Sequence, residues 1–343
     1  MSERRRVRLS PTQQRLLFYG GLAALITAGT LFMTRMPGHT HTGPVPPPSA
    51  LEAEAARQLE RHVRVLAHDI GERRIGEGDS LAHAHDYIRG KLLPLIGTDR
   101  ETLTFENLGP AGSEAQNIVL ELHGESPARV IVGAHYDSAP GTPGANDNAS
   151  GVAAALMLAE HFAGRPLGNT LRVVFFANEE PPYFQNDGMG SLHHAQACAQ
   201  RGDQVLAMLS LESLGYYSDA PGSQHYPGKL VGLAYPDQGN FVAFVGNLGS
   251  RSLVRHAIEV FRRTAAVPSE GAALPSWIPG VDWSDHSSFW KFGYPAIMVT
   301  DTAVFRDEHY HQFDDTPEHL SYTTLARVVL GLEHVIEDLT AAR

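Results

Sequence analysis

The sequence predicts an α/β domain in which helices cover both faces of a mixed, mostly parallel sheet, preceded by one N-terminal transmembrane helix. Two segments rich in apolar and β-branched residues, 129–134 and 171–177, are typical of buried strands, and an Ala-rich helical pattern at 152–162 separates them. This alternation of strand and helix favours parallel strands in one sheet. An uncharged apolar run at 16–33 is long enough to cross a bilayer.

The N-terminal segment predicts how the protein is anchored. Residues 1–15 form a basic tail, and residues 16–34 form the transmembrane signal anchor. Because positive residues stay on the cytoplasmic side, we expect the rest of the chain on the periplasmic or extracellular side. A cleaved signal peptide is the alternative, since residues 26–28 form a weak small-residue site. The anchor is favoured because the apolar run continues to Met33.

A linker at residues 35–50 leads to the body of the protein, residues 51–343, which is expected to be one domain. Dense prolines in the linker are typical of a semi-extended tether rather than of a packed element. The whole chain carries a formal charge of −11 and its first 50 residues carry +5, so the remainder carries −16. An acidic body argues against nucleic acid as a partner. The sequence carries no signal for an oligomeric state.

The first elements of the body lie before the Ala-rich helix. Helical patterns at 51–66 and 80–93 are followed by strand-like segments at 102–105 and 117–122. We expect the segment 117–122 to pair with 129–134 as a hairpin, because only a short connection separates the two.

A metal site is predicted where the strand 129–134 ends. His135 and Asp137 follow this strand, and a Gly/Pro loop leads from them to Asp147 at the start of the next helix. Neutral imidazole and carboxylate oxygens suit zinc, and a pair of metals needs a carboxylate that bridges them, for which Asp147 is the candidate. Asp137 can fix the tautomer of His135 by accepting a hydrogen bond from its other ring nitrogen.

Further ligand candidates follow later strands. The strand 171–177 ends on Asn178, Glu179 and Glu180, so one carboxylate can bind metal while its neighbour acts as a general base. Glu212 ends the next predicted strand, and His311 lies in a loop beyond the last one. Because open α/β sheets bind their ligands at the carboxyl ends of strands, we expect these side chains to meet.

The segments GAHYDS, GANDNASG, NEE, SDHSSFW and YHQFDDT, in this order, resemble the co-catalytic di-zinc peptidases of metallopeptidase family M28. This family includes bacterial leucyl aminopeptidase, aminopeptidase Y, glutamate carboxypeptidase II and glutaminyl cyclases. The resemblance covers residues 55 to 340 approximately and implies the zinc-exopeptidase version of the predicted fold, which is phosphorylase/hydrolase-like.

The resemblance also implies the ligands of two Zn²⁺ ions per chain. One zinc would be held by His135 and Glu212, the other by Glu180 and His311, and Asp147 would bridge them. Many members have Asp where this chain has Glu212, so the geometry at that metal can differ.

Other roles follow from the same resemblance. Glu179 would be the general base that activates a metal-bridging hydroxide, Tyr310 a donor to the oxyanion, and Asp137 the partner of His135. Asp285 and His286 match a motif beside the active site, with helix capping as an equally weighted alternative.

The function implied is that of a membrane-anchored metallo-aminopeptidase acting on peptide substrates. Two alternatives stay open. A glutaminyl cyclase uses related residues and typically one zinc, but carries Trp where Tyr310 stands here. A non-catalytic receptor-like member usually lacks ligands that this chain has. The family's turn after the glutamate pair is often shorter, so the segment 181–184 is expected to shape the substrate pocket.

Overall fold

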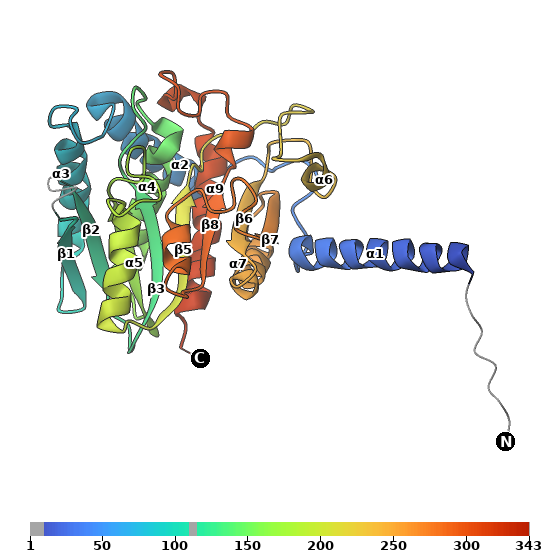
Figure 1. Ribbon diagram of the computed structural model, residues 1–343. Helices are drawn as coiled ribbons and strands as arrows, with labels where there is room; N and C mark the ends of the chain where they lie inside the picture. The colour runs from blue at the N-terminus through green and yellow to red at the C-terminus, as the bar shows by residue number, and fades with distance from the viewer. Residues whose placement is uncertain (1–9, 110–114, 343) are drawn as a thin grey trace.

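The computed structural model describes residues 10–109 and 115–342, and it contains one sheet of eight strands in the order β1-β2-β4-β3-β5-β8-β6-β7 (Figure 1). The four central strands, β4, β3, β5 and β8, are parallel. The β2 and β6 strands flank them in antiparallel pairing. The predicted mixed, mostly parallel sheet is therefore confirmed. The strands are β1 (Glu101–Asn107), β2 (Gln116–Leu122), β3 (Ser126–His135), β4 (Asn169–Phe176), β5 (Val205–Glu212), β6 (Val242–Asn247), β7 (Ser269–Leu274) and β8 (Ala296–Thr300).

Helices cover both faces of this sheet. One face is packed against α4, α7 and α9, with α2 lying on α4 and α9, while α5 and α8 lie together on the other face. The central strands are buried on both faces, as their continuous apolar residues require. The helices of the body are α2 (Ala50–Arg64), α3 (Ser80–Leu92), α4 (Gly151–Phe162), α5 (Gly190–Arg201), α6 (Lys229–Gly232), α7 (Arg251–Thr264), α8 (His286–Trp290) and α9 (Tyr322–Thr340).

The expected hairpin between the segments 117–122 and 129–134 is wrong. The β2 strand pairs with β1 and β4, both antiparallel, and β3 pairs in parallel with β4 and β5. The β4 strand thus lies between β2 and β3. Its sequence explains the position, because a strand that is apolar on both faces is most stable in the centre of a sheet.

The proline-rich segment 35–50 lies along the domain, which differs from the expected tether. Arg262 donates a hydrogen bond to the carbonyl oxygen of Pro37 at 3.0 Å. The backbone N–H of Ser269 donates to Thr40 Oγ1 at 2.7 Å, and Arg327 donates to the carbonyl oxygen of Pro46. Prolines leave their carbonyl groups free as acceptors, and arginines of α7 and α9 supply the donors.

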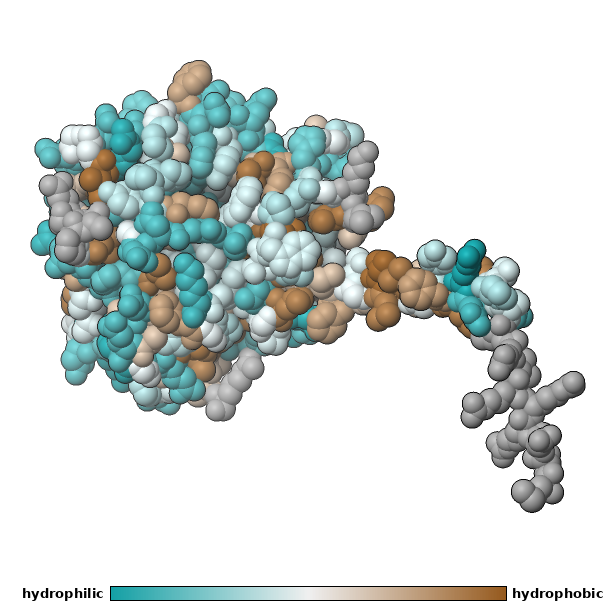
Figure 2. Space-filling model, viewed as in Figure 1, coloured by the Kyte–Doolittle hydropathy of each residue, from teal (hydrophilic) through white to brown (hydrophobic). Residues whose placement is uncertain are grey.

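The N-terminal helix α1 (Pro11–Thr34) projects from the β7 end of the sheet (Figure 1). None of its residues is buried, and its apolar side chains near the body are exposed in Figure 2. The helix is long and apolar enough to cross a membrane, although a signal sequence meets the same criteria. Arg251 joins the helix to the domain by donating to the carbonyl oxygen of Phe32 at 2.7 Å and lying over its ring.

Candidate metal centre

The predicted ligands come together at the carboxyl ends of the central strands. His135 is the last residue of β3, Glu180 follows β4 closely, and Glu212 is the last residue of β5. Asp147 lies at the non-helical kink in the segment Ala145–Ser150 that precedes α4, and His311 lies in the loop between β8 and α9. Parallel strands bring their carboxyl ends to one edge of the sheet, so residues far apart in the sequence meet there.

Asp147 lies between two pairs of potential ligands. Its Oδ1 atom is 3.2 Å from Nε2 of His135, and its Oδ2 atom is 3.0 Å from Nε2 of His311. His135 Nε2 is also 3.3 Å from Glu212 Oε2, and His311 Nε2 is 3.3 Å from Glu180 Oε1. The two oxygens of one carboxylate thus face two different His/Glu pairs.

Three of these atoms are buried without a hydrogen-bond partner among the described residues: His135 Nε2, Asp147 Oδ1 and Glu180 Oε1. Buried polar atoms are normally paired, so unpaired atoms that point at one another indicate a missing cation. Imidazole nitrogen and carboxylate oxygen are also the donors that zinc prefers besides thiolate. The residues present therefore fit divalent-cation binding.

The titration behaviour of the cluster agrees with this fit. Burial and the neighbouring Asp147 raise the pKa of Glu180 to about 8. Burial opposes protonation of His311, but the nearby carboxylates of Asp147 and Glu180 outweigh burial and raise its pKa to about 10. Without metal, the cluster is thus partly neutralised by bound protons, and divalent cations would take their place.

Asp137 positions two parts of the site at once. Its Oδ1 atom is 3.4 Å from Nδ1 of His135, so the expected pairing of these two side chains is geometrically possible. Its two oxygens also accept the backbone N–H groups of Glu179 at 3.1 Å and Glu180 at 3.0 Å. The carboxylate of Asp137 therefore holds the turn that carries both glutamates, and His135 Nδ1 lies beside both this carboxylate and the Asp137 backbone carbonyl oxygen, which is 3.3 Å away.

Several supporting residues were not predicted from the sequence. The carboxylate of Asp315 accepts the backbone N–H groups of Asn146 and Asp147 at 2.8 and 3.1 Å. Ser213 and Ser284 donate to the two oxygens of Glu212 at 3.0 and 2.8 Å. Asp315 and Ser284 lie within YHQFDDT and SDHSSFW, and these segments were the available signal.

One fully buried cation, Arg73, also escaped prediction. It donates to the carbonyl oxygens of Tyr136, Pro143 and Gly144 and so braces the loop between β3 and α4. A single arginine outside any motif has no signal in the sequence.

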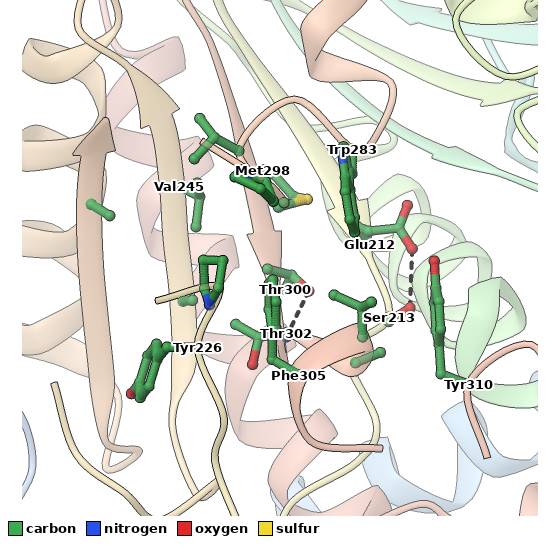
Figure 3. A pocket seen from close by; sticks show the side chains of 18 of the residues that line it. Glu212, Ser213, Tyr226, Val245, Trp283, Met298, Thr300, Thr302, Phe305 and Tyr310 are labelled. Atoms are coloured by element: carbon green, nitrogen blue, oxygen red, sulfur yellow. Dashed lines mark hydrogen bonds between the residues drawn. The ribbon is translucent and has the colours of Figure 1, made fainter. Parts of the chain in front are cut away.

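Tyr310 and His286 have different surroundings. The ring of Tyr310 stacks on His311 with centroids 4.0 Å apart, and its side chain lies close to Glu212 (Figure 3). Burial and the nearby carboxylates raise the pKa of Tyr310, which keeps its hydroxyl protonated as a donor. The Nε2 atom of His286 lies 2.8 Å from the carbonyl oxygen of Val281, and its ring packs on Trp290, so His286 does not join the cluster.

Asp285, the other motif residue, is buried at the N-terminal end of α8 without capping that helix by its side chain. Burial raises its pKa to about 7, and His135 lowers it only in part. Among the described residues, Asp285 belongs to no group of side chains close enough to share a metal, so it lies near the cluster without joining it.

A cavity of about 430 Å³ opens from the cluster. Glu179, Glu180 and His311 line one end of it. Pro181 and Phe184 also line it, so the segment after the glutamate pair does shape the pocket, as expected. Figure 3 shows that the cavity extends from Glu212 and Tyr310 across the face of the sheet.

Comparison with known proteins places these observations in a family. The sequence profile of Peptidase family M28 matches residues 117–336. Uncharacterized protein YfbL of Escherichia coli (strain K12) is 36% identical over 293 residues, which cover 83% of this chain and 88% of that protein. Leucine aminopeptidase 1 of Trichoderma harzianum is 26% identical over 68% of this chain, which spans 56% of that longer protein.

Solved structures with very different sequences share the fold. LapB from Legionella pneumophila superposes with a TM-score of 0.67 at 18% identity, covering 88% of this chain and 78% of that one. BSAP, a zinc aminopeptidase from Bacillus subtilis, superposes with a TM-score of 0.61 at 15% identity, covering 84% of this chain and 95% of that one. Porphyromonas gingivalis glutaminyl cyclase superposes with a TM-score of 0.61 at 17% identity, covering 84% of this chain and 99% of that one. With the family profile matching well over half of its residues, the chain belongs to Peptidase family M28.

Proposed function

We propose that this protein is a zinc-dependent aminopeptidase that removes N-terminal residues from peptides. The observation that carries the proposal is the position of Asp147, whose two oxygens face two His/Glu pairs beside an open cavity. His135 and Glu212 would hold one zinc, Glu180 and His311 the other, with Asp147 bridging the two. Bound zinc would supply a Lewis acid for the peptide carbonyl and would acidify a water molecule.

Glu179 is assigned the proton transfers. It lines the cavity, its Oε2 atom is 4.0 Å from His135 Nε2, and Asp137 fixes its backbone. From this position its carboxylate can take a proton from the attacking water and return it to the leaving amine. The Tyr310 hydroxyl, which lines the cavity beside Glu212, can donate to the oxygen that becomes negative in the transition state (Figure 3).

The electrostatics of the cavity support action at an amino terminus rather than at a carboxyl terminus. None of the described residues that line the cavity is Lys or Arg, so no side chain there would pair with the free carboxylate of a peptide. Two Zn²⁺ ions would offset the charges of Asp147, Glu179, Glu180 and Glu212, but carboxylate oxygens would remain as acceptors for a free ammonium group. The leucine aminopeptidase names of relatives such as that of Trichoderma harzianum support the same activity.

A pool of short peptides tests this proposal. The full-length, detergent-solubilised, zinc-loaded protein is incubated with peptides whose amino termini are free or acetylated, some of them beginning with Gln. Mass spectrometry should show stepwise loss of first residues from the free peptides alone. Cleavage of acetylated peptides would contradict the aminopeptidase assignment, and loss of ammonia from the Gln peptides would indicate a glutaminyl cyclase instead.

A further inference from the structure

The end of the cavity farthest from the metal centre carries a carboxylate of its own. Strand register links Glu212 to Thr300, Thr300 to Ala243, and Ala243 to Glu270, so these four residues form one row across β5, β8, β6 and β7. Partner residues in a row point to the same face of a sheet. At about 4.8 Å per strand, the α-carbons of Glu212 and Glu270 are about 14 Å apart.

Between these two carboxylates the floor of the cavity is mainly apolar. Ala243 lies in the row itself, and the next row on the same face contains Met298, Val245 and Ala272. All four line the cavity, and Figure 3 shows Val245 and Met298 on the strands between Glu212 and the far end. Tyr226 and Tyr235, whose rings stack 5.9 Å apart, add walls near the far end.

Glu270 has no full partner within the described parts of the chain. It lines the cavity, 21% of its side chain is exposed, and no described group donates a hydrogen bond to it. The nearest cation is Arg262, whose Nη2 atom is 3.9 Å away. Arg262 donates its hydrogen bonds to Ser269 and Pro37 instead. A carboxylate at the end of an apolar cavity can therefore accept from a ligand.

We propose that Glu270 recognises the cationic end of a lysine or arginine side chain on the residue whose carbonyl lies at the metal centre. The inference rests on the proposed peptidase reaction, because that reaction places the scissile carbonyl beside Glu212. An alkyl stem would lie on Ala243, Val245 and Met298, and its cation would meet Glu270.

Glu270 could instead bind a second cationic group of a peptide, the terminal ammonium. This would require one additional residue between the amino terminus and the bond that is cleaved. The apolar floor favours the side chain over this group. An additional residue would bring a peptide N–H and C=O onto a floor of mainly Ala, Val and Met side chains, where unpaired polar groups are unfavourable. The hydroxyl of Thr300, which lies in the same row, already accepts the backbone N–H of Thr302 at 2.8 Å. An alkyl stem requires no such partners.

The test compares two substrates that differ only in the cation. Lysyl and norleucyl 7-amido-4-methylcoumarin have the same four-carbon stem, and kcat/KM is measured on the zinc-loaded full-length protein and on Glu270→Gln. We expect kcat/KM of the wild type to be about tenfold or more higher for the lysyl substrate, because a hydrogen bond to a charged group stabilises by that amount. Glu270→Gln should abolish this preference and leave norleucine within twofold. The control is Glu337→Gln on α9, because the side chain of Glu337 is exposed and does not line the cavity.

Four results separate the possible explanations. An unchanged lysine preference in Glu270→Gln would overturn the inference. An equal loss of kcat/KM on both substrates, together with a lower Tm, would also overturn it, because it would indicate a structural pairing of Glu270 with Arg262. Release of dipeptides from unblocked peptides would assign Glu270 to the terminal ammonium instead. Calorimetric binding of lysine and norleucine hydroxamates is measured in parallel. If neither coumarin is cleaved but Glu270→Gln still weakens only lysine hydroxamate, recognition stands and the proposed function fails.

Discussion

Asp147 has to direct its two oxygens to different partners, and its backbone is held for that purpose. Asp315 accepts the N–H groups of Asn146 and Asp147, and the Asn146 side chain is held in turn by Asp301 and Asp307 at 3.0 Å each. The carboxylates of Asp301 and Asp307 therefore support the loop and do not line the cavity. At the scale of single residues, much of the site consists of side chains that fix other side chains.

Glu179→Gln separates metal binding from proton transfer. Glutamine keeps the shape of the side chain but cannot accept a proton, so we expect kcat to fall by about 10²–10⁴-fold. Zinc content, measured by elemental mass spectrometry, should equal that of the wild type. Glu337→Gln serves as the matched control on α9. A variant that keeps its turnover would remove Glu179 from the role of general base.

Asp137→Asn tests the orientation of the site without touching a proposed ligand. Asparagine has one acceptor oxygen in place of two, so it cannot hold His135 and the turn of Glu179 and Glu180 as the carboxylate does. We expect zinc affinity to fall about 10–100-fold, measured by competition with a chromophoric chelator. Asp86→Asn, at a side chain that is 70% exposed, is the control. Equal affinities in the two variants would contradict the role given to Asp137.

The proposed ligands could be predicted because each follows a recognisable strand or lies in a motif. Supporting residues could not, because their contacts join segments far apart in the chain. Asp315 meets Asp147 across 168 residues, and Ser284 meets Glu212 across 72. Their segments YHQFDDT and SDHSSFW indicate proximity to the site, but not which residue each side chain contacts, because that contact forms only when the whole sheet is assembled.

At the scale of elements, the strongest patterns gave the correct strands, and the weak ones failed. The strands β3 and β4 were recognisable from their apolar residues, whereas β6 (VAFVGN) and β7 (SEGAAL) are short and rich in small residues and were not identified. These two strands form the floor of the far half of the cavity. Pairing order was also beyond the sequence, because β4 enters between two strands that precede it in the chain.

The contact between α2 and α3 predicts a pH dependence of stability. His62 on α2 is buried, its Nδ1 lies 2.7 Å from the Tyr87 hydroxyl on α3, and burial, with nearby Lys91 and Arg61, lowers its pKa to about 4 from 6.5. Between these pH values the unfolded chain binds a proton that the folded protein does not. The free energy of unfolding should therefore fall as the pH falls from 6.5 to 4, by at most about 3 kcal/mol from this group.

Urea unfolding at pH 7 and pH 5 measures this effect. His62→Gln should lose less stability between the two pH values than the wild type, because the titrating group is gone. His68→Gln, at a side chain that is 69% exposed, should behave like the wild type. If His62→Gln shows the same pH dependence as the wild type, His62 is not the group responsible.

At the scale of the whole molecule, the helix α1 and the body are joined directly. Arg251, Arg255 and Arg262 of α7 donate to the carbonyl oxygens of Phe32, Arg35 and Pro37, and Met36 packs against the core. The domain is thus held at the end of α1 rather than on a free tether. Composition alone could not predict this, because the donors belong to a helix more than 200 residues away.

We propose that α1 spans the membrane with residues 1–15 in the cytoplasm and the peptidase domain, residues 51–343, outside. The only cysteine of the chain, Cys198, is buried, which allows labelling of single introduced cysteines. In intact cells, a membrane-impermeant maleimide should label Glu337→Cys and spare Ser10→Cys, both made in a Cys198→Ser background. Labelling of both sites, or loss of the N-terminal segment from the mature protein, would contradict the anchor.

The zinc stoichiometry of the full-length protein tests the central claim most directly. After removal of metal by a chelator, calorimetric titration with Zn²⁺ should give two equivalents per chain, and Asp147→Asn should bind less tightly because both half-sites share that carboxylate. Turnover should be lost with the metal and return with it. One zinc or none per wild-type chain would contradict a paired site built on Asp147.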